Sequence, residues 1–164
     1  MERLTAKYQT RNPYELCEAL GIRISVKELG ADICAYYYYY SRVHNILINS
    51  HASDDMRRIL LAHELGHARL HKHIAILKGF REMDIFDMVQ PTEYEANVFA
   101  AELLIADSSL LDLLNGDSAS FYQVVSQLCL PADLVDLKLR ALKCKGYHVE
   151  PLYIANGEFL RNII

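Results

Sequence analysis

The sequence predicts an α+β fold, with a small antiparallel sheet packed on a helical domain that contains one central helix. Segments rich in β-branched and aromatic residues are confined to residues 22–48, and apolar residues at helical spacing dominate from residue 53 onward. The chain has 164 residues, of which 52% are hydrophobic and 23% are charged. A chain of this size and composition buries a core without needing disulfides or a structural metal.

We expect a single domain over residues 1–164, because neither an internal repeat nor a linker-like segment divides the chain. Its parts follow one another in sequence: an N-terminal helix and sheet at about 12–50, two helices that carry the chemistry at about 53–105, and C-terminal helices with a tail at about 107–164.

The N-terminal part begins with a short helix and continues as strands. Pro13 suits the first turn of a helix, and Gly21 suits its end. Three segments rich in β-branched and aromatic residues follow, separated by turn residues, at 22–26, 33–40 and 43–48. These segments predict the antiparallel sheet.

The central helix is predicted from Ser53 to about Lys72. Ser53 is a favourable N-cap, and acidic residues follow it in the first turn. Apolar residues then recur on one face at helical spacing, together with His63 and His67.

Further helices are predicted after a loop at about 79–90. Thr92 and Glu95 form a capping-box pattern, which predicts a helix that ends near residue 105. Pro131 breaks the last helical segment. The remaining expectations are helices at about 108–114 and 120–143, and a tail at 147–164 with strand-like pieces around the turn pair at 156–157.

The pattern His63-Glu64-Leu65-Gly66-His67 lies on the central helix and indicates a metal site. Residues four apart lie above one another on one helical face, so both imidazoles can reach one Zn²⁺. Glu64 projects beside the metal, where it can accept a proton from the attacking water. We therefore expect His63 and His67 as ligands and Glu64 as the catalytic carboxylate.

A catalytic zinc site needs a third protein ligand, and the sequence offers three candidates. His71 lies eight residues after His63, about 12 Å along a helix, so the two cannot share one ion. His73 stands where one zinc-peptidase pattern has its third histidine, but that pattern needs a glycine at the position of Leu70. His73 is therefore a weaker candidate than an acid on the next helix.

Glu93 is the acid that we assign to the metal. It shares a helix face with Ala96, Asn97 and Ala100, whose small size lets this helix approach the metal helix closely. Glu95 is expected to be engaged in the capping box instead. Asn97, one turn after Glu93, can form a hydrogen bond with a ligating imidazole.

Five consecutive tyrosines, residues 36–40, form part of the second predicted strand. Alternate side chains of a strand face opposite sides of the sheet. One interpretation is a purely structural strand. The functional alternative is an edge strand that pairs with an extended substrate, with Tyr36, Tyr38 and Tyr40 on one face. His44 and His51 flank the next strand, where either can stabilise an oxyanion or lie at the surface.

Two motifs together resemble the ImmA/IrrE family of zinc-dependent endopeptidases, a minimal gluzincin group. They are HELGHxxLH at 63–71 and ExEANxFAAELL at 93–104. The resemblance implies that His63, His67 and Glu93 hold Zn²⁺ and that Glu64 is the catalytic carboxylate. The usual Met-Pro after the second motif is replaced here by Ile-Ala at 105–106.

Members of that family encoded on phages and integrative elements cleave, or trigger cleavage of, helix-turn-helix repressors. The resemblance therefore implies a protein substrate of this kind and an anti-repressor role in transcription regulation. The alternative is a regulatory module that binds and occludes a repressor without catalysis.

Composition narrows the partners and the location. The formal net charge is −4, which disfavours direct nucleic-acid binding and weakens a third hypothesis, a DNA-binding helix-turn-helix at 123–140. We expect the basic side chains of residues 138, 140, 143 and 145 to be a solvated cluster near a helix end. No segment is apolar enough to cross a membrane, no apolar signal segment opens the chain, and the four cysteines are widely spaced, so we expect a cytoplasmic protein with reduced thiols.

Overall fold

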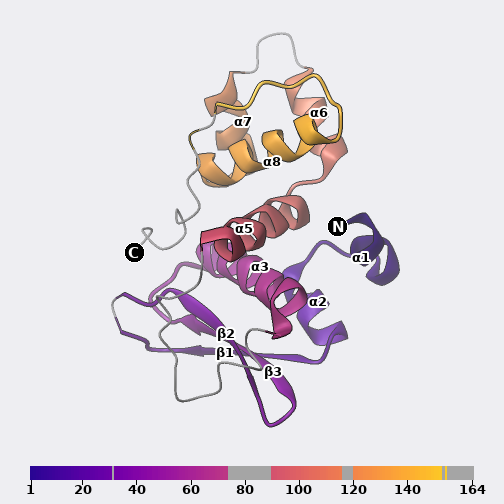
Figure 1. The fold of residues 1–164 in the computed structure, drawn as a ribbon. Coiled ribbons are helices and arrows are strands. Elements are labelled where there is room, and N and C mark those ends of the chain that lie inside the picture. Colours follow the sequence, from indigo (N-terminus) through magenta and orange to yellow (C-terminus); the bar gives the residue numbers. More distant parts are fainter. Residues whose placement is uncertain (31, 74–89, 116–119, 153, 155–164) are drawn as a thin grey trace.

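The computed structural model describes residues 1–30, 32–73, 90–115, 120–152 and 154. It confirms an α+β fold, with the sheet at one end, two long helices in the middle and a layer of helices at the other end (Figure 1). The predicted loop at about 79–90, apart from Gln90, and the strand-like pieces around 156–157 lie outside the described residues.

The chain begins with two short helices, α1 (Glu2–Tyr8) and α2 (Pro13–Ala19). Helix α2 starts as predicted, because the Tyr14 backbone N–H donates to the Asn12 side chain at 3.0 Å and a proline follows the cap. No apolar pattern in the sequence predicts helix α1, because the helix contains no buried residue and only its Leu4 and Tyr8 pack partly against the core.

The sheet is mixed, so the prediction of an antiparallel sheet is wrong for one of its strands. Its strands are β1 (Ile22–Lys27), β2 (Ala35–Tyr40) and β3 (Val43–Asn49), in the order β1-β3-β2. Strand β2 pairs with β3 in an antiparallel hairpin, whereas β1 pairs with β3 in parallel. The connection after β1 carries the chain past β3 to the far edge, and strand composition does not reveal this order.

Helix α3 (Asp54–Leu70) is the predicted central helix, and Ser53 caps it by accepting from the Met56 N–H at 3.3 Å. Every residue from Ile59 to Ala68 is buried, because the sheet and α2 cover the helix on some sides and α5 covers another. A helix enclosed in this way places its histidines and Glu64 away from bulk water.

Helix α5 (Gln90–Leu104) lies against α3 in the middle of the molecule (Figure 1). It begins before Thr92, so the predicted capping box at Thr92 and Glu95 is wrong. A Cβ atom added at Gly66 would lie 3.1 Å from the Ala96 Cα and 3.2 Å from the Phe99 Cβ. A glycine on α3 is thus what allows the two helices to approach this closely.

The C-terminal helices form a second core beyond α5. They are α6 (Asp107–Leu114), α7 (Phe121–Leu128) and α8 (Ala132–Cys144), so the break predicted near Pro131 is confirmed. Their buried side chains include Leu110, Val124 and Leu142. In the described part of the chain, no helix is long and apolar enough to cross a membrane.

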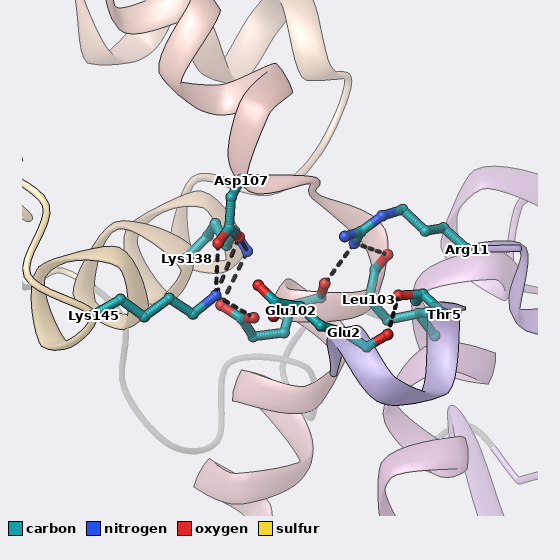
Figure 2. A network of polar contacts seen from close by, with 8 residues as sticks. All are labelled: Glu2, Thr5, Arg11, Glu102, Leu103, Asp107, Lys138 and Lys145. Atoms are coloured by element: carbon teal, nitrogen blue, oxygen red, sulfur yellow. Dashed lines mark hydrogen bonds and ion pairs between the residues drawn. The ribbon is translucent and has the colours of Figure 1, made fainter. Parts of the chain in front are cut away.

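The basic residues of α8 are not the solvated cluster that the sequence predicts. Lys138 is fully buried and its Nζ donates to the Glu102 carboxylate at 3.0 Å and also to the Asp107 carboxylate. Lys145 donates to the same two carboxylates at 2.7 and 2.8 Å (Figure 2). Arg140 and Lys143 pair with acids at 136 and 150. The ion pairs of Lys138 and Lys145 join α5 and α6 to α8 and its C-terminal cap.

Arg11 holds the C-terminal end of α5 from the other side. Its Nη1 donates to the backbone carbonyl oxygens of Glu102 at 2.9 Å and Leu103 at 3.2 Å (Figure 2). The last carbonyls of a helix lack partners within the helix, so this arginine satisfies two of them. The end of α5 is therefore bound both to the N-terminal segment and to the C-terminal helices.

Candidate active site

Two histidines of α3 point their Nε2 atoms at one place. His63 and His67 are one helical turn apart and both are buried. Their Nε2 atoms lie 3.0 Å apart. The four-residue spacing thus brings the two rings together, as the pattern of the motif predicts.

Glu93 reaches the same place from α5. Its two carboxylate oxygens lie 3.3 Å from His63 Nε2 and 3.4 Å from His67 Nε2. A tetrahedral ion with bonds of about 2.0–2.1 Å holds its ligand atoms about 3.3 Å apart. The three observed separations match this requirement, so the residues present fit a metal ion of the size of Zn²⁺.

The three residues form the one group within the described residues whose ligand atoms are close enough for a metal ion, all lying within 4.8 Å of one another. His73, the weaker candidate from the sequence, is exposed and is not part of this group. His51 is also outside it and lies 3.6 Å from the exposed Glu28.

The outward nitrogen of each histidine has a partner of its own. His63 Nδ1 donates to the Asn97 side-chain oxygen at 2.8 Å, so Asn97 takes the position that the sequence predicts for it. His67 Nδ1 lies 3.0 Å from His71 Nδ1, and His71 Nε2 donates to the Glu95 carboxylate at 2.9 Å. The sequence reasoning assigned no such role to His71 and Glu95.

A signal for this pair was present in the sequence. His71 continues the spacing of His63 and His67 by one more turn, and Glu95 lies on the same helix as Glu93. The spacing excludes His71 as a ligand beside His63, but it places the His71 ring against the ring of His67.

Glu64 lies beside the cluster with one carboxylate oxygen unpaired. It is buried, and its Oε2 is without a hydrogen-bond partner among the described residues. The pKa of Glu64 is raised to about 7, chiefly by burial; His63 opposes this shift and the neighbouring Glu93 adds to it. A hydrogen bond from the Tyr37 backbone N–H also opposes it. A carboxyl group with a pKa near 7 is suited to exchange protons at neutral pH.

The charge states of two cluster residues suit metal binding. Burial resists ionisation of Glu93, but hydrogen bonds from His63 and His67 outweigh it and leave the pKa of Glu93 well below its usual value. Burial lowers the pKa of His67 to about 4. An anionic carboxylate and a neutral imidazole are the forms that ligate metals.

Strand β2 runs along the edge of the sheet next to this site. Tyr37 faces the core, and its hydroxyl lies 2.7 Å from His44 Nδ1. Tyr36 and Tyr38 share the opposite face, with ring centroids 5.6 Å apart, and Tyr40 is exposed. Because the Tyr37 backbone hydrogen-bonds Glu64, the edge of β2 passes directly beside the catalytic candidate.

Two histidines and a glutamate around a metal-sized space, next to a buried second glutamate, define a metallopeptidase arrangement. The family model of the IrrE N-terminal-like domain (Peptidase_M78) matches residues 17–120, and the chain belongs to this family. The match includes every residue of the cluster.

Two curated proteins are similar over most of the chain. An uncharacterized immunity region protein 2 of Bacillus phage phi105 is 36% identical over 143 residues, which cover 84% of this chain and 89% of that protein. The metallopeptidase ImmA of Bacillus subtilis strain 168 is 28% identical over 133 residues, which cover 79% of this chain and 76% of that protein. The chain is thus a member of a metallopeptidase family with a similar protein in a phage immunity region.

Proposed function

We propose that this protein is a zinc-dependent endopeptidase whose substrate is a protein, specifically a helix-turn-helix repressor. The observation that carries the enzymatic part is the meeting of three ligand residues beside the unpaired Glu64 Oε2. The two histidine Nε2 atoms lie 3.0 Å apart, and each lies 3.3 to 3.4 Å from one of the two Glu93 carboxylate oxygens. A purely structural site would not need a buried carboxylate with one oxygen left unpaired, because an unpaired buried oxygen costs free energy.

His63, His67 and Glu93 would hold the metal. A set of two imidazole nitrogens and one carboxylate favours Zn²⁺. Bound there, Zn²⁺ would polarise the scissile carbonyl and lower the pKa of a water molecule toward 7. Glu64 accepts the proton of the attacking water at its free oxygen and passes it to the leaving amine.

The outer edge of β2, the last strand in the order of the described sheet, is the proposed binding strand for the substrate. An extended peptide that adds to this edge would run past the Tyr37 backbone and hence past Glu64. Tyr36, Tyr38 and Tyr40 would contact it through their face of the strand, since aromatic rings offer large contact area with a polar tip.

The repressor substrate is supported by the similar proteins. One is named for a phage immunity region and another is named a metallopeptidase, ImmA. Repressors maintain phage immunity, so a peptidase of this region would act on one of them. The pairing of Lys138 and Lys145 with carboxylates disfavours the alternative of DNA binding through α8, because these lysines are already engaged within the protein.

The metal site is tested by counting zinc. Native mass spectrometry and elemental analysis of chelator-free wild type should give about one zinc per chain, and Glu93→Ala should lose most of it, because the third ligand is gone. Full retention of zinc in Glu93→Ala would contradict the assignment.

The catalytic step is tested with Glu64→Gln, an isosteric change that keeps the fold and the metal. We expect cleavage of the cognate repressor to be at least about 100-fold slower, in the range typical of a lost general base. Gel electrophoresis after co-expression of the two proteins measures this cleavage. If Glu64→Gln relieves repression as well as wild type without cleavage, the protein instead acts by binding and occluding the repressor.

A further inference from the structure

The strongest feature that the proposed function leaves unused is a hydrogen-bonded chain of three side chains, His67, His71 and Glu95. His67 Nδ1 and His71 Nδ1 are 3.0 Å apart, and His71 Nε2 and a Glu95 carboxylate oxygen are 2.9 Å apart. His67 and His71 are buried, whereas the side chain of Glu95 is 59% exposed. This hydrogen-bonded chain therefore leads from the metal cluster to the surface.

The two contacts admit one consistent arrangement of protons around a metal. A metal on His67 Nε2 requires the proton of that ring to sit on Nδ1. His67 Nδ1–H then donates to His71 Nδ1, which must accept. His71 consequently carries its own proton on Nε2, and this N–H donates to the Glu95 carboxylate, an acceptor. No atom in the chain is left with the wrong role.

Helix α5 supports both histidines of the cluster in this way. Asn97 receives the Nδ1–H of His63 directly, at 2.8 Å. Glu95 receives that of His67 through His71. The helix that supplies the ligand Glu93 therefore also supplies the group that orients each imidazole.

We infer that His71 and Glu95 are positioning residues for His67: they hold its ring so that the Nε2 lone pair faces His63 and Glu93. This inference rests on the metal site of the proposed function. Groups that orient a metal-ligating histidine in this manner change metal affinity by about 10- to 100-fold when they are removed.

The test compares two substitutions of similar size at residue 71. In His71→Asn, the side-chain oxygen takes the place of the ring Nδ1 and can still accept from His67. In His71→Leu no acceptor remains. Competition with a chromophoric chelator should show a 10- to 100-fold loss of Zn²⁺ affinity for His71→Leu and a change of no more than about threefold for His71→Asn.

A second variant guards against misfolding of the buried position. Glu95 is largely exposed, so Glu95→Ala keeps the fold while removing the last acceptor of the chain. We expect an intermediate loss of Zn²⁺ affinity, and Glu95→Gln, whose amide oxygen can still accept, should restore most of it. His73→Leu, at an exposed histidine of the same segment, is the matched control and should bind as wild type.

Thermal unfolding of the metal-free variants shows whether each is folded. Wild-type affinity in folded His71→Leu and in Glu95→Ala would overturn the inference and leave the metal site intact. Failure of the wild type itself to bind Zn²⁺ would overturn the proposed function and the inference with it. Equal losses in His71→Leu and His71→Asn would also overturn it, because an acceptor for His67 Nδ1–H remains in His71→Asn and is absent from His71→Leu.

Discussion

At the scale of single residues, the site combines groups whose environments push their protonation in opposite directions. Burial raises the pKa of Glu64, whereas the two histidines keep Glu93 ionised despite its burial. One carboxyl is thus suited to carry a proton and the other to bind a cation. The two roles follow from neighbours a few ångströms away and not from residue type.

The raised pKa of Glu64 predicts a pH dependence of the metal-free protein. Between pH 4.5 and about 7 the native state retains a proton on Glu64 that the unfolded state has released. The free energy of unfolding contributed by Glu64 therefore falls as pH rises through this window, by at most about 1.4 kcal/mol per pH unit, and levels off above it.

Glu64→Gln is the control, because it does not titrate. Urea unfolding of metal-free wild type and Glu64→Gln at a series of pH values should show that the variant gains stability relative to wild type between pH 4.5 and 7. A difference that does not vary with pH would mean that Glu64 has an ordinary pKa in the folded protein.

His63, Glu64, His67 and Glu93 could be predicted from the sequence because each obeys a local rule of helical spacing or helix contact. His71 and Glu95 could not be paired in advance, since their contact depends on how α3 and α5 are aligned. The burial of Lys138 was equally hidden, because charged residues on a helix are exposed unless a partner from another element covers them.

At the scale of elements, the contact between α3 and α5 sets the geometry of the site. Gly66 and Ala96 touch where the helices cross, with only 3.1 Å between the Ala96 Cα and the place of a Cβ on Gly66. Glu93 lies one turn before Ala96 on α5. The distance from Glu93 to the histidines therefore depends on the absence of a side chain at residue 66.

Gly66→Ala should move α5 away from α3 by a few tenths of an ångström or more. Overpacking of this kind costs about 1–3 kcal/mol of stability, and we expect Zn²⁺ affinity to fall as well because Glu93 is displaced. Gly30→Ala is the control, since a Cβ there meets nothing within 4 Å. Chelator competition and thermal unfolding measure both effects. Unchanged affinity in Gly66→Ala would show that α5 adjusts without moving its ligand.

The positions of most helices and strands could be read from the sequence, but the order of the strands could not. The segment after β1 contains no signal for whether β1 will pair with β2 or with β3, and this choice decides whether its pairing is antiparallel or parallel. The hairpin between β2 and β3 was easier to predict, because only Ser41 and Arg42 separate the two strands. In the structure these two residues form its turn with φ angles of 49° and 64°.

At the scale of the whole molecule, two cores are connected through α5. One core lies between the sheet, α3 and α5, and the other lies among the C-terminal helices. Lys138 stands at their junction, fully buried between Glu102 of α5 and Asp107 of α6. Loss of one partner leaves the others buried without a counter-charge, so this group holds the two cores together only while Lys138, Glu102 and Asp107 are all present.

Lys138→Met, which keeps the length of the side chain but not its charge, should lower the free energy of unfolding by about 3 kcal/mol, near the lower end for a broken buried pair, because Lys145 still contacts both carboxylates. Lys143→Met is the control. Its partner Glu150 is exposed, and the change should cost less than about 1 kcal/mol. Equal effects in urea unfolding would mean that the junction contributes nothing special.

The way α5 is held has a consequence for the smallest chain that could work. All residues proposed to bind metal or move protons lie before residue 105, so a fragment that ends after α5 would still contain them. Yet Glu93 and Glu102 lie about 14 Å apart on one helix, and the far end of that helix is secured by side chains from α8. A fragment that ends at α5 would contain every reactive group and the Arg11 contacts, but it would lose the lysine contacts that help to hold Glu93 in place against α3.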